Sequence, residues 1–435
     1  MDSDGGLGQN PDFRYGAITR IIKHLEDDAF VERSRQQSGK KSFCRRRKLP
    51  FAFLIVLLIQ GLQRSLQRDL DRFFQQLQRS DFSVPQFTKG AFSKSRSQLK
   101  PTAFAELNEV ALQSFYSDAP YKSFEGFRLL AVDSSTLMLP RHSSVVARFG
   151  EYGFGPGAAS RRSMARTSLL YDACNLTVLH GCIEGLGYQE IHLLERHLPH
   201  VRAGQDLVVA DRGYASRRLM ALLGERGIDF VIRVPVRKWH VVRDFVGEGC
   251  MEKTLEVPLK EGGAVALRLV RVELGDGTVE VLATSVAADR LPAACFKELY
   301  HLRWGLEEAY KLLKARLCLE AFSGKTALSV EQDFHAALFA VTMTAILCFP
   351  VAEKLQQENN KAGRPQKHPR QINRTTALSK VRQSAIGMFL HGLVEKALAA
   401  LDLIFRQCTE IIRPNRSFKR NKKQPKPPNQ YYKQL

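Results

Sequence analysis

The sequence lacks the patterns that mark a zinc-binding or a membrane-spanning protein. Its eight cysteines form no C-x-x-C pair, so a structural zinc site is not expected. The longest apolar run, residues 51–59, is far short of the roughly 20 residues that a membrane span needs, and it is not N-terminal like a signal peptide. We expect a buried helix there, and reduced, mostly buried thiols in a cytoplasmic protein.

Acidic residues are missing from three segments that are rich in Lys and Arg. Residues 33–48 hold eight basic residues, residues 361–382 hold seven and residues 413–435 hold eight. The rest of the chain is close to neutral, because it has 42 of the 65 basic residues against all 44 acidic ones. The net charge of +21 is thus concentrated in segments that suit a polyanion. Since they have no apolar face, we expect them to bind DNA non-specifically rather than a membrane.

The first 120 residues have helical patterns, at about 15–27, 50–64 and 66–79 and from Pro101 to about Tyr116. Thr88 caps a further short helix in which Phe92 and Leu99 face inward. The expected outward residues, which are candidate DNA contacts, are Lys89, Lys94 and Arg96. Such a helix suits a major groove, and an ordinary solvated surface is the alternative.

Strands and helices alternate in the middle of the chain, over residues 121–350. The expected strands are 127–132, 166–171, 177–183, 206–210 and 230–234, and the expected helices are 188–200 and 216–225. This is the element order of a ribonuclease H-like α/β core. A β-rich insertion is expected at about 237–290, with strands at 241–246, 264–272 and 279–286.

The C-terminal region, residues 351–435, is expected to be helical and basic. An apolar helical segment at 341–349 precedes it. A polar basic loop at 359–375 leads into a last helix at about 378–412, and a basic tail ends the chain.

Two carboxylates, Asp133 and Asp211, each follow an apolar strand. In an open α/β sheet, ligands sit at the carboxyl ends of the strands. Two acids at that edge repel each other unless a cation joins them. With Glu307 as a third acid, the set would hold one or two Mg²⁺ ions, which activate a water or hydroxyl for phosphoryl transfer. The alternative for each Asp alone is a turn or N-cap residue.

Glu307 lies in a predicted helix, residues 299–314. Several of the charged and phenolic side chains of this helix lie on one side. At about 100° per residue, Tyr300, Arg303, Glu307 and Lys314 share an arc of roughly 60°. A leucine stripe lies beside that arc and consists of residues 299, 302, 306, 313 and 317. This arrangement suits a metal ion and a phosphate, and a surface helix with i,i+4 ion pairs is the alternative.

The spacing Tyr300-x2-Arg303-x3-Glu307-x6-Lys314 resembles the Tyr-Arg-Glu-Lys signature of DDE transposases of bacterial insertion sequences, in the group typified by insertion sequence four. The segments around the two aspartates, 132–135 and 210–214, and two segments between them, 160–162 and 169–172, are also similar to that family.

The resemblance implies a metal-dependent transposase that cuts DNA at the element ends and transfers the strands into target DNA. It implies Asp133, Asp211 and Glu307 as catalytic metal ligands, with Mg²⁺ as the metal and Mn²⁺ as a substitute. The implied phosphate-binding residues are Tyr300, Arg303, Lys314 and Arg212. The implied partners are double-stranded DNA, as terminal inverted repeats and as target, and a second copy of the chain in the DNA complex.

Further residues are candidate DNA contacts with plain alternatives. Arg161 and Arg162 lie in one of the similar segments. Trp239 and Trp304, the only tryptophans, could stack on a flipped base, but we expect both to pack in the core. His142, His192 and His301 show no ligand spacing and are expected to be structural or surface groups.

Two other functions remain open from the sequence. One is a DNA-binding protein derived from a transposase that no longer catalyses, against which the three intact carboxylates argue. The other is a metal-dependent nuclease without strand transfer.

Overall fold

The computed structural model describes residues 12–37, 43, 49–62, 65–155, 157, 160–260, 262–274, 277–360 and 369–412. The chain divides into two compact units. One unit is Lys122–Glu331, and the other takes the chain up to Tyr121 together with the chain from Gln332. The N-terminal and C-terminal regions, which the sequence analysis separates, therefore share a unit. Of the acid-free segments, 413–435 lies wholly outside the described residues, and 33–48 and 361–382 lie partly outside them.

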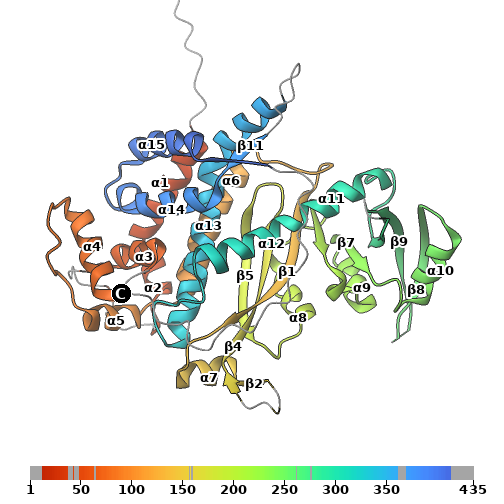
Figure 1. The fold of residues 1–435 in the computed structure, drawn as a ribbon, viewed down its shortest axis with the longest axis horizontal. Coiled ribbons are helices and arrows are strands. Elements are labelled where there is room, and N and C mark those ends of the chain that lie inside the picture. The colour runs from red at the N-terminus through yellow and green to blue at the C-terminus, as the bar shows by residue number, and fades with distance from the viewer. Residues whose placement is uncertain are drawn as a thin grey trace, which may run out of the picture. The chain divides into compact units, whose positions relative to one another are not determined.

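The unit that contains both ends of the chain is helical (Figure 1). Its helices are α1 (Phe13–Glu26), α2 (Asp28–Arg33), α3 (Phe51–Gln60), α4 (Leu66–Gln78), α5 (Lys89–Arg96), α6 (Thr102–Asp118), most of α13 (Ala327–Asn360), α14 (Arg374–Ala385), a π-helix (Ile386–Leu390) and α15 (Val394–Gln407). A two-stranded sheet pairs β11 (Arg370–Ile372) with β12 (Thr409–Ile411). The helices expected near the N-terminus are confirmed, and α2 was not foreseen.

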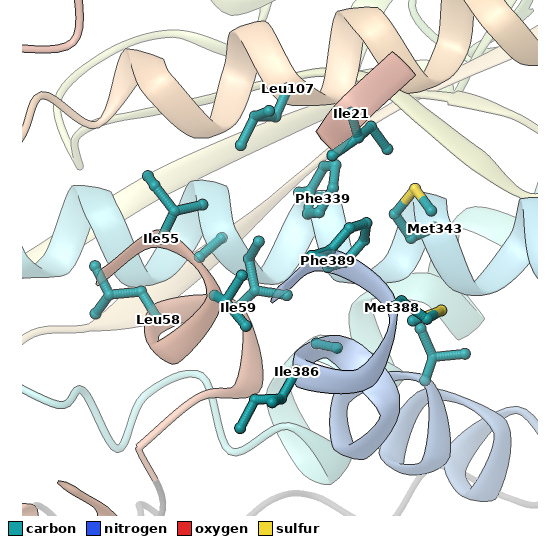
Figure 2. Close-up of a cluster of buried hydrophobic side chains, with 14 of the residues drawn as sticks. Ile21, Ile55, Leu58, Ile59, Leu107, Phe339, Met343, Ile386, Met388 and Phe389 are labelled. Carbon is teal, nitrogen blue, oxygen red and sulfur yellow. The ribbon is translucent and has the colours of Figure 1, made fainter. Parts of the chain in front are cut away.

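The core of this unit is a cluster of aliphatic and aromatic side chains from most of these helices. Figure 2 shows Ile55, Leu58 and Ile59 of α3 in the same cluster as Phe339 of α13 and Phe389 of the π-helix. The apolar run at 51–59 is thus a buried helix, as expected. Helix α13 is long and apolar enough to cross a membrane, but 72% of its most apolar window is buried inside the structure. We read it as a core helix.

Helix α5 begins as expected, because the Thr88 hydroxyl accepts a hydrogen bond from the Ala91 N–H at 3.2 Å. Lys89 and Lys94 are exposed. The expectation that Arg96 faces outward is wrong. Its guanidinium is buried, with Nε 2.6 Å from Gln332 Oε1 and Nη2 2.8 Å from an Asp333 carboxylate oxygen.

The last expected helix, 378–412, is two helices rather than one. The chain leaves α14 through the π-helix and turns at Gly392, whose φ of 64° is a left-handed conformation that glycine adopts without strain. Residues 409–411 are extended and pair with β11.

The second unit is built on one eight-stranded sheet with the order β5-β4-β1-β6-β7-β10-β9-β8. The strands are β1 (Arg128–Met138), β4 (Met164–Asp172), β5 (Thr177–Gly185), β6 (Asp206–Ala210), β7 (Asp229–Val234), β8 (Glu252–Pro258), β9 (Ala264–Glu273) and β10 (Val279–Thr284). A small hairpin pairs β2 (Tyr152–Phe154) with β3 (Ser160–Arg162). The other elements are α7 (Ser143–Phe149), α8 (Glu190–Glu195), α9 (Arg217–Glu225), α10 (His240–Glu248), α11 (Phe296–Leu302), α12 (Trp304–Lys311) and short helical turns. The sheet is mixed, because β1, β6 and β7 are parallel and the other pairs are antiparallel.

The strands and helices expected from residue 127 to 234 are present in the expected order, but α7 and the β2–β3 hairpin, which were not foreseen, lie between the first two of these strands. The expected end of the first strand is wrong, since β1 continues to Met138. Strand β6 stops pairing with β1 at Val132, but β4 stays paired along the whole remainder of β1. Asp133 therefore lies inside a strand, at the position where one of its two neighbouring strands ends.

The insertion at 237–290 is partly as expected. Strands β9 and β10 are confirmed, and β8 was missed. Residues 241–246, expected as a strand, belong to helix α10. Its buried residues, Val242 and Phe245, are three apart, which is a helical spacing. Strands β8 to β10 extend the main sheet beyond β7.

The cysteines are less buried than expected. Of the seven in the described residues, only Cys182 is buried, and Cys250 and Cys318 are exposed. All seven are free thiols.

A buried ion pair joins β1 to β6 at their first residues. Arg128 and Asp206 are 8% and 0% exposed, and two hydrogen bonds of 2.7 and 2.6 Å link the guanidinium to both carboxylate oxygens. The pair holds the parallel register on which the positions of Asp133 and Asp211 depend.

Replacing Arg128 by Ala should lower the free energy of unfolding by about 3–5 kcal/mol, because Asp206 would be left as an unpaired buried charge. Chemical denaturation measures the change. Lys253→Ala is the matched control, since it breaks an exposed pair with Glu248 in the same unit and should have no measurable effect. Equal, small effects of the two substitutions would contradict a role for the Arg128 pair.

Candidate active site

The two candidate aspartates lie side by side, Asp133 in β1 and Asp211 just after the end of β6, where it caps the helical turn Arg212–Tyr214. Val132 of β1 is in register with Ala210 of β6, and Asp133 and Asp211 are the next residues. Each carboxylate accepts one backbone hydrogen bond. The Ser134 N–H donates to Asp133 Oδ1 at 2.8 Å, and the Gly213 N–H donates to Asp211 Oδ1 at 2.5 Å.

The pKa of Asp133 reflects the repulsion between acids that lie close together. Burial raises the pKa of Asp133 to about 6, and repulsion from Asp211 and Glu190 adds to the rise. The Ser134 N–H and the charge of Arg303 work in the opposite direction. The site therefore favours a cation or a proton at Asp133.

The predicted helix 299–314 carries the signature residues. It lies over this part of the sheet but is not one continuous α-helix. It consists of α11 and α12, which meet at a turn at Arg303, and a π-helix over Leu312–Arg316. Helix α12 contacts β1, as Figure 1 shows. Three leucines of the expected stripe, 299, 306 and 313, are buried, and those at 302 and 317 are half-buried. Gly305 is the second residue of α12, and a Cβ there would lie 3.6 Å from the ring of Tyr171.

Tyr310 fixes the helix to the strand that carries Asp133. Its hydroxyl is 2.9 Å from the Asp133 carbonyl oxygen and 3.3 Å from that of Thr167. Lys314 makes a second link, because its Nζ donates to Ser135 Oγ at 2.8 Å. Both contacts reach β1 or its neighbour β4 close to the aspartate pair.

Arg303 is a buried cation between the carboxylates. It is 5% exposed, and its Nη2 is 3.3 Å from Glu307 Oε1. Its guanidinium lies 5.3 Å from the ring centre of Tyr300 and 5.6 Å from that of Trp304. Burial works to lower the pKa of Arg303, but the acidic groups Tyr300, Asp133 and Glu307 raise it above its ordinary value. Arg303 therefore does form the i,i+4 ion pair with Glu307 that was the alternative in the sequence analysis. The same guanidinium also faces Asp133.

Tyr300 is packed beside Arg303, as expected, and its hydroxyl is unusual. The residue is 6% exposed, and among the described residues the hydroxyl has no hydrogen-bond partner. Burial raises the pKa of Tyr300 to about 12, with Arg303 opposing and Asp211 adding to the rise. A buried hydroxyl of this kind is normally paired with a protein group, water or a ligand.

The remaining predicted residues are spread over the surface. Arg212, in the turn after Asp211, is exposed. Arg161 is exposed and Arg162 half-buried in β3. Lys89 and Lys94 belong to the other unit.

The expectation that both tryptophans pack in the core is right for Trp239 and wrong for Trp304. Trp239 is 9% exposed and packs against the guanidinium of Arg217 at 5.2 Å. Trp304 is 51% exposed, next to Arg303. The stacking alternative therefore stays open for Trp304.

Sequence reasoning missed Glu190, which starts α8. The Ser134 hydroxyl donates to Glu190 Oε1 at 2.5 Å, and Arg166 Nη1 lies 3.0 Å from the same oxygen. No spacing in the sequence links residue 190 to the aspartates, because the contact depends on how α8 packs on the sheet. Tyr310 was also missed, although its position three residues after Glu307 puts it near the same helix face.

A histidine cluster around the buried His197 adjoins β4 and was not foreseen either. His197 Nδ1 is 2.7 Å from His180 Nδ1, and His197 Nε2 is 2.9 Å from Ser168 Oγ. Ser168 in turn donates to the Asp133 carbonyl oxygen at 3.3 Å. Burial lowers the pKa of His197 well below its usual value, so the ring is neutral and serves packing and hydrogen bonding.

The donor set fits a hard divalent cation in its chemistry. Asp133 and Asp211 offer oxygen ligands side by side, and further carboxylates stand nearby. In the side-chain positions of the described residues, no three His, Cys, Asp or Glu groups are close enough to share one ion. Binding would therefore need a third carboxylate to turn toward the pair.

Paired aspartates at a strand end of a mixed α/β sheet, under a helix that carries Glu307 and the buried Arg303, are an arrangement typical of enzymes that act on phosphate esters. The family model described as "Transposase DDE domain" matches residues 125–343, and the chain belongs to this family. It is a transposase.

Among solved structures, the chain is similar to "Cryo-EM structure of piggyBac transposase synaptic complex with hairpin DNA (SNHP)". The identity is 10%, the match covers 89% of this chain and 83% of that chain, and the TM-score is 0.42. No curated protein sequence matches the chain.

The raised pKa of Asp133 predicts a pH-dependent stability in the absence of metal. Between pH 3.8 and about 6 the folded state binds more protons at this group than the unfolded state, so stability should fall as pH rises through that window. The free energy of unfolding should fall by at most ~3 kcal/mol for this pKa shift. Asp133→Asn should remove this pH dependence, and the variant should be more stable than the unsubstituted protein at pH 7.5.

Chemical denaturation with a chelator at pH 4, 5, 6 and 7.5 checks this. Asp244→Asn, an exposed acid on α10, is the control and should follow the unsubstituted protein. Parallel pH curves for Asp133→Asn and the unsubstituted protein would contradict the prediction.

Proposed function

We propose that this transposase catalyses metal-dependent cleavage at the ends of a DNA element and strand transfer into target DNA, in cut-and-paste transposition. The unit Lys122–Glu331 would be a ribonuclease H-like catalytic core with a β-rich insertion. The spacing of Tyr300, Arg303, Glu307 and Lys314 supports a place in the insertion-sequence-four group of bacterial elements.

The observation that carries the proposal is the register of β1 and β6, which sets Asp133 beside Asp211 under the helix that bears Glu307. These three residues would be the metal ligands, with Mg²⁺ as the ion and Mn²⁺ as a substitute. When bound, the metal supplies activation of a water or hydroxyl and stabilisation of the leaving oxygen.

The cations of the helix suit the DNA backbone. Arg303 offers a planar fork that matches a phosphate, and Lys314 offers a point charge near Ser135. Arg212 is exposed in the turn after Asp211, and Tyr300 packs against Arg303. We assign these four residues to the phosphates around the cut.

The partners follow from the activity. They are double-stranded DNA, both as terminal inverted repeats and as target, and a second copy of the chain in the DNA complex. The basic excess supports binding of a polyanion, and we place the protein in the cytoplasm, on the nucleoid. Lys89, Lys94, Arg161, Arg162 and Trp304 stay candidate contacts because they are exposed or half-buried.

Asp211→Asn should abolish cleavage and leave DNA binding intact, because the amide keeps the shape of the side chain but loses the charge that holds a metal. Single-turnover cleavage of a DNA carrying the element end, with a gel-shift assay on the same variant, measures both. Asp244→Asn is the control and should cleave normally.

The same assays separate the alternatives. An unsubstituted protein that binds DNA but never cuts it would be a transposase-derived binding protein, and cleavage without joined products would indicate a nuclease. Normal cleavage by Asp211→Asn would refute the proposed site.

Arg303→Ala should weaken binding to the cleaved end and slow strand transfer by about 1–3 kcal/mol, the range for a charged hydrogen bond. Lys314→Ala should act in the same direction but more mildly, because a flexible point charge fixes geometry less well. Single-turnover strand transfer and the melting temperature are measured on each variant.

Lys311→Ala is the matched control for Arg303→Ala. Lys311 is a cation on the same helix that pairs with Glu308 and is exposed. A lower melting temperature for Arg303→Ala with near-normal strand transfer would mean that Arg303 only stabilises the helix.

A further inference from the structure

The carboxylates of Asp133 and Asp211 are each oriented by a backbone N–H close by in the chain. Ser134, the residue after Asp133, donates from its N–H to Asp133 Oδ1 at 2.8 Å. Gly213, in the turn Arg212–Tyr214, donates from its N–H to Asp211 Oδ1 at 2.5 Å. The directions of the two carboxylates therefore depend on where these two N–H groups stand.

Glu190 holds the first of these donors in place. It starts α8, which contacts β1, β4 and the turn Arg212–Tyr214. The Ser134 hydroxyl donates to Glu190 Oε1 at 2.5 Å, and Arg166 Nη1 of β4 donates to the same oxygen at 3.0 Å. Because successive residues of a strand point to opposite faces, Ser134 meets Glu190 on the face away from the Asp133 side chain. Glu190 thus fixes Ser134 from behind, while the N–H of Ser134 orients Asp133.

The same side chain packs against the second donor. A Cβ placed on Gly213 would lie 2.8 Å from Glu190 Oε2, so only glycine permits this approach. The φ of Gly213 is not in the left-handed region, so the close contact rather than the backbone conformation calls for glycine here. The bonds from Ser134 and Arg166 keep the carboxylate from turning away. One carboxylate therefore touches both residues whose N–H groups orient the aspartates.

Glu190 also has an ordinary structural account. An acid in the first turn of a helix is favoured by the helix dipole, and the ion pair with Arg166 ties α8 to β4. On this account the side chain would stabilise the fold and have no bearing on cleavage. The contacts with Ser134 and Gly213 go beyond it, because these two residues and no surface groups receive the carboxylate.

We propose that Glu190 is a positioning residue for the aspartate pair. Its carboxylate fixes Ser134 and Gly213, and through their N–H groups it sets the directions of the Asp133 and Asp211 side chains. This inference rests on the proposed function and adds to it a residue on α8 that acts through the backbone of two others. Because Glu190 acts as a hydrogen-bond acceptor, an uncharged acceptor of the same shape should replace it.

The first test compares two substitutions of Glu190 in single-turnover cleavage, with DNA binding measured on the same variants. Glu190→Ala should slow cleavage at least about 10-fold and leave DNA binding unchanged, as expected for a residue that orients metal ligands. Glu190→Gln keeps an oxygen acceptor for Ser134 and Arg166, and it should cleave within about 3-fold of the unsubstituted protein. Glu195→Ala, at the exposed other end of α8, is the matched control and should cleave normally.

Two results of this comparison would overturn the inference. Equal losses for Glu190→Ala and Glu190→Gln would mean that the charge of Glu190, and not its hydrogen bonds, matters for cleavage. Normal cleavage by Glu190→Ala with a lower melting temperature would mean that Glu190 only stabilises the fold.

Hydrogen–deuterium exchange of the DNA-free protein provides a readout that does not depend on cleavage. In Glu190→Ala the peptides that contain Ser134 and Gly213 should exchange at least about 10-fold faster, and those of α9 should exchange as before. Faster exchange confined to α8 would contradict the proposed role.

Gly213→Ala tests the second contact, and it serves alone if Glu190→Ala does not fold. The added methyl group would displace Glu190 Oε2, so cleavage should fall at least about 10-fold. In the Glu190→Ala background the methyl group has no carboxylate to displace, and the further change should stay within about 2-fold. Normal cleavage by Gly213→Ala, or additive losses in the double variant, would overturn the inference.

Asp211→Asn in the same cleavage assay separates this inference from the proposed function. If Asp211→Asn is inactive and Glu190→Ala cleaves normally, only the role of Glu190 fails. If Asp211→Asn cleaves normally, the proposed metal site itself fails.

Discussion

The candidate site depends on the parallel pairing of β1 with β6. A shift of one residue between these strands would move Asp133 to the other face of the sheet relative to its neighbours. The ion pair of Arg128 with Asp206 stands at the first position of the register, and the two aspartates stand just past its last. Buried polar groups at one end of the strands thus fix the alignment of acids at the other. An apolar contact is less directional and would specify the register less strictly.

A second constraint keeps the signature helix on the sheet. Tyr310 donates to the backbone of Asp133, and Lys314 donates to Ser135, so both contacts are made to the strand that carries the first aspartate. The turn at Arg303 and the π-helix after Lys311 change the direction of the side chains along this segment. These irregularities replace the uniform helical arc that the sequence spacing suggests, yet they keep Arg303 and Glu307 on the side of the aspartates.

Local patterns predicted the order of the strands and helices well, because the apolar strands and the capped helices are specified by residues close in sequence. They failed where packing decides. Residues 241–246 are rich in valine and phenylalanine, which suits a strand, but the burial of Val242 and Phe245 selects a helix. Arg96 looked like a surface cation, and only the fold supplies its buried partners Gln332 and Asp333. Asp133 and Asp211 could be found at strand ends, whereas Glu190 reaches them only through the docking of α8.

Arg303 links the two parts of the proposed chemistry. In the structure its guanidinium offsets the charges of Glu307 and Asp133, and its Nε has no partner among the described residues. In the proposed function the same group holds a DNA phosphate. A guanidinium presents donors on two edges, as Arg14 does when it bonds Asp12 and Asp402 together, so Arg303 can keep its contact with Glu307 through Nη2 while its Nε side receives a phosphate. In the proposed function, Arg303 would thus hold the DNA phosphate next to the carboxylate of Glu307, one of the proposed metal ligands.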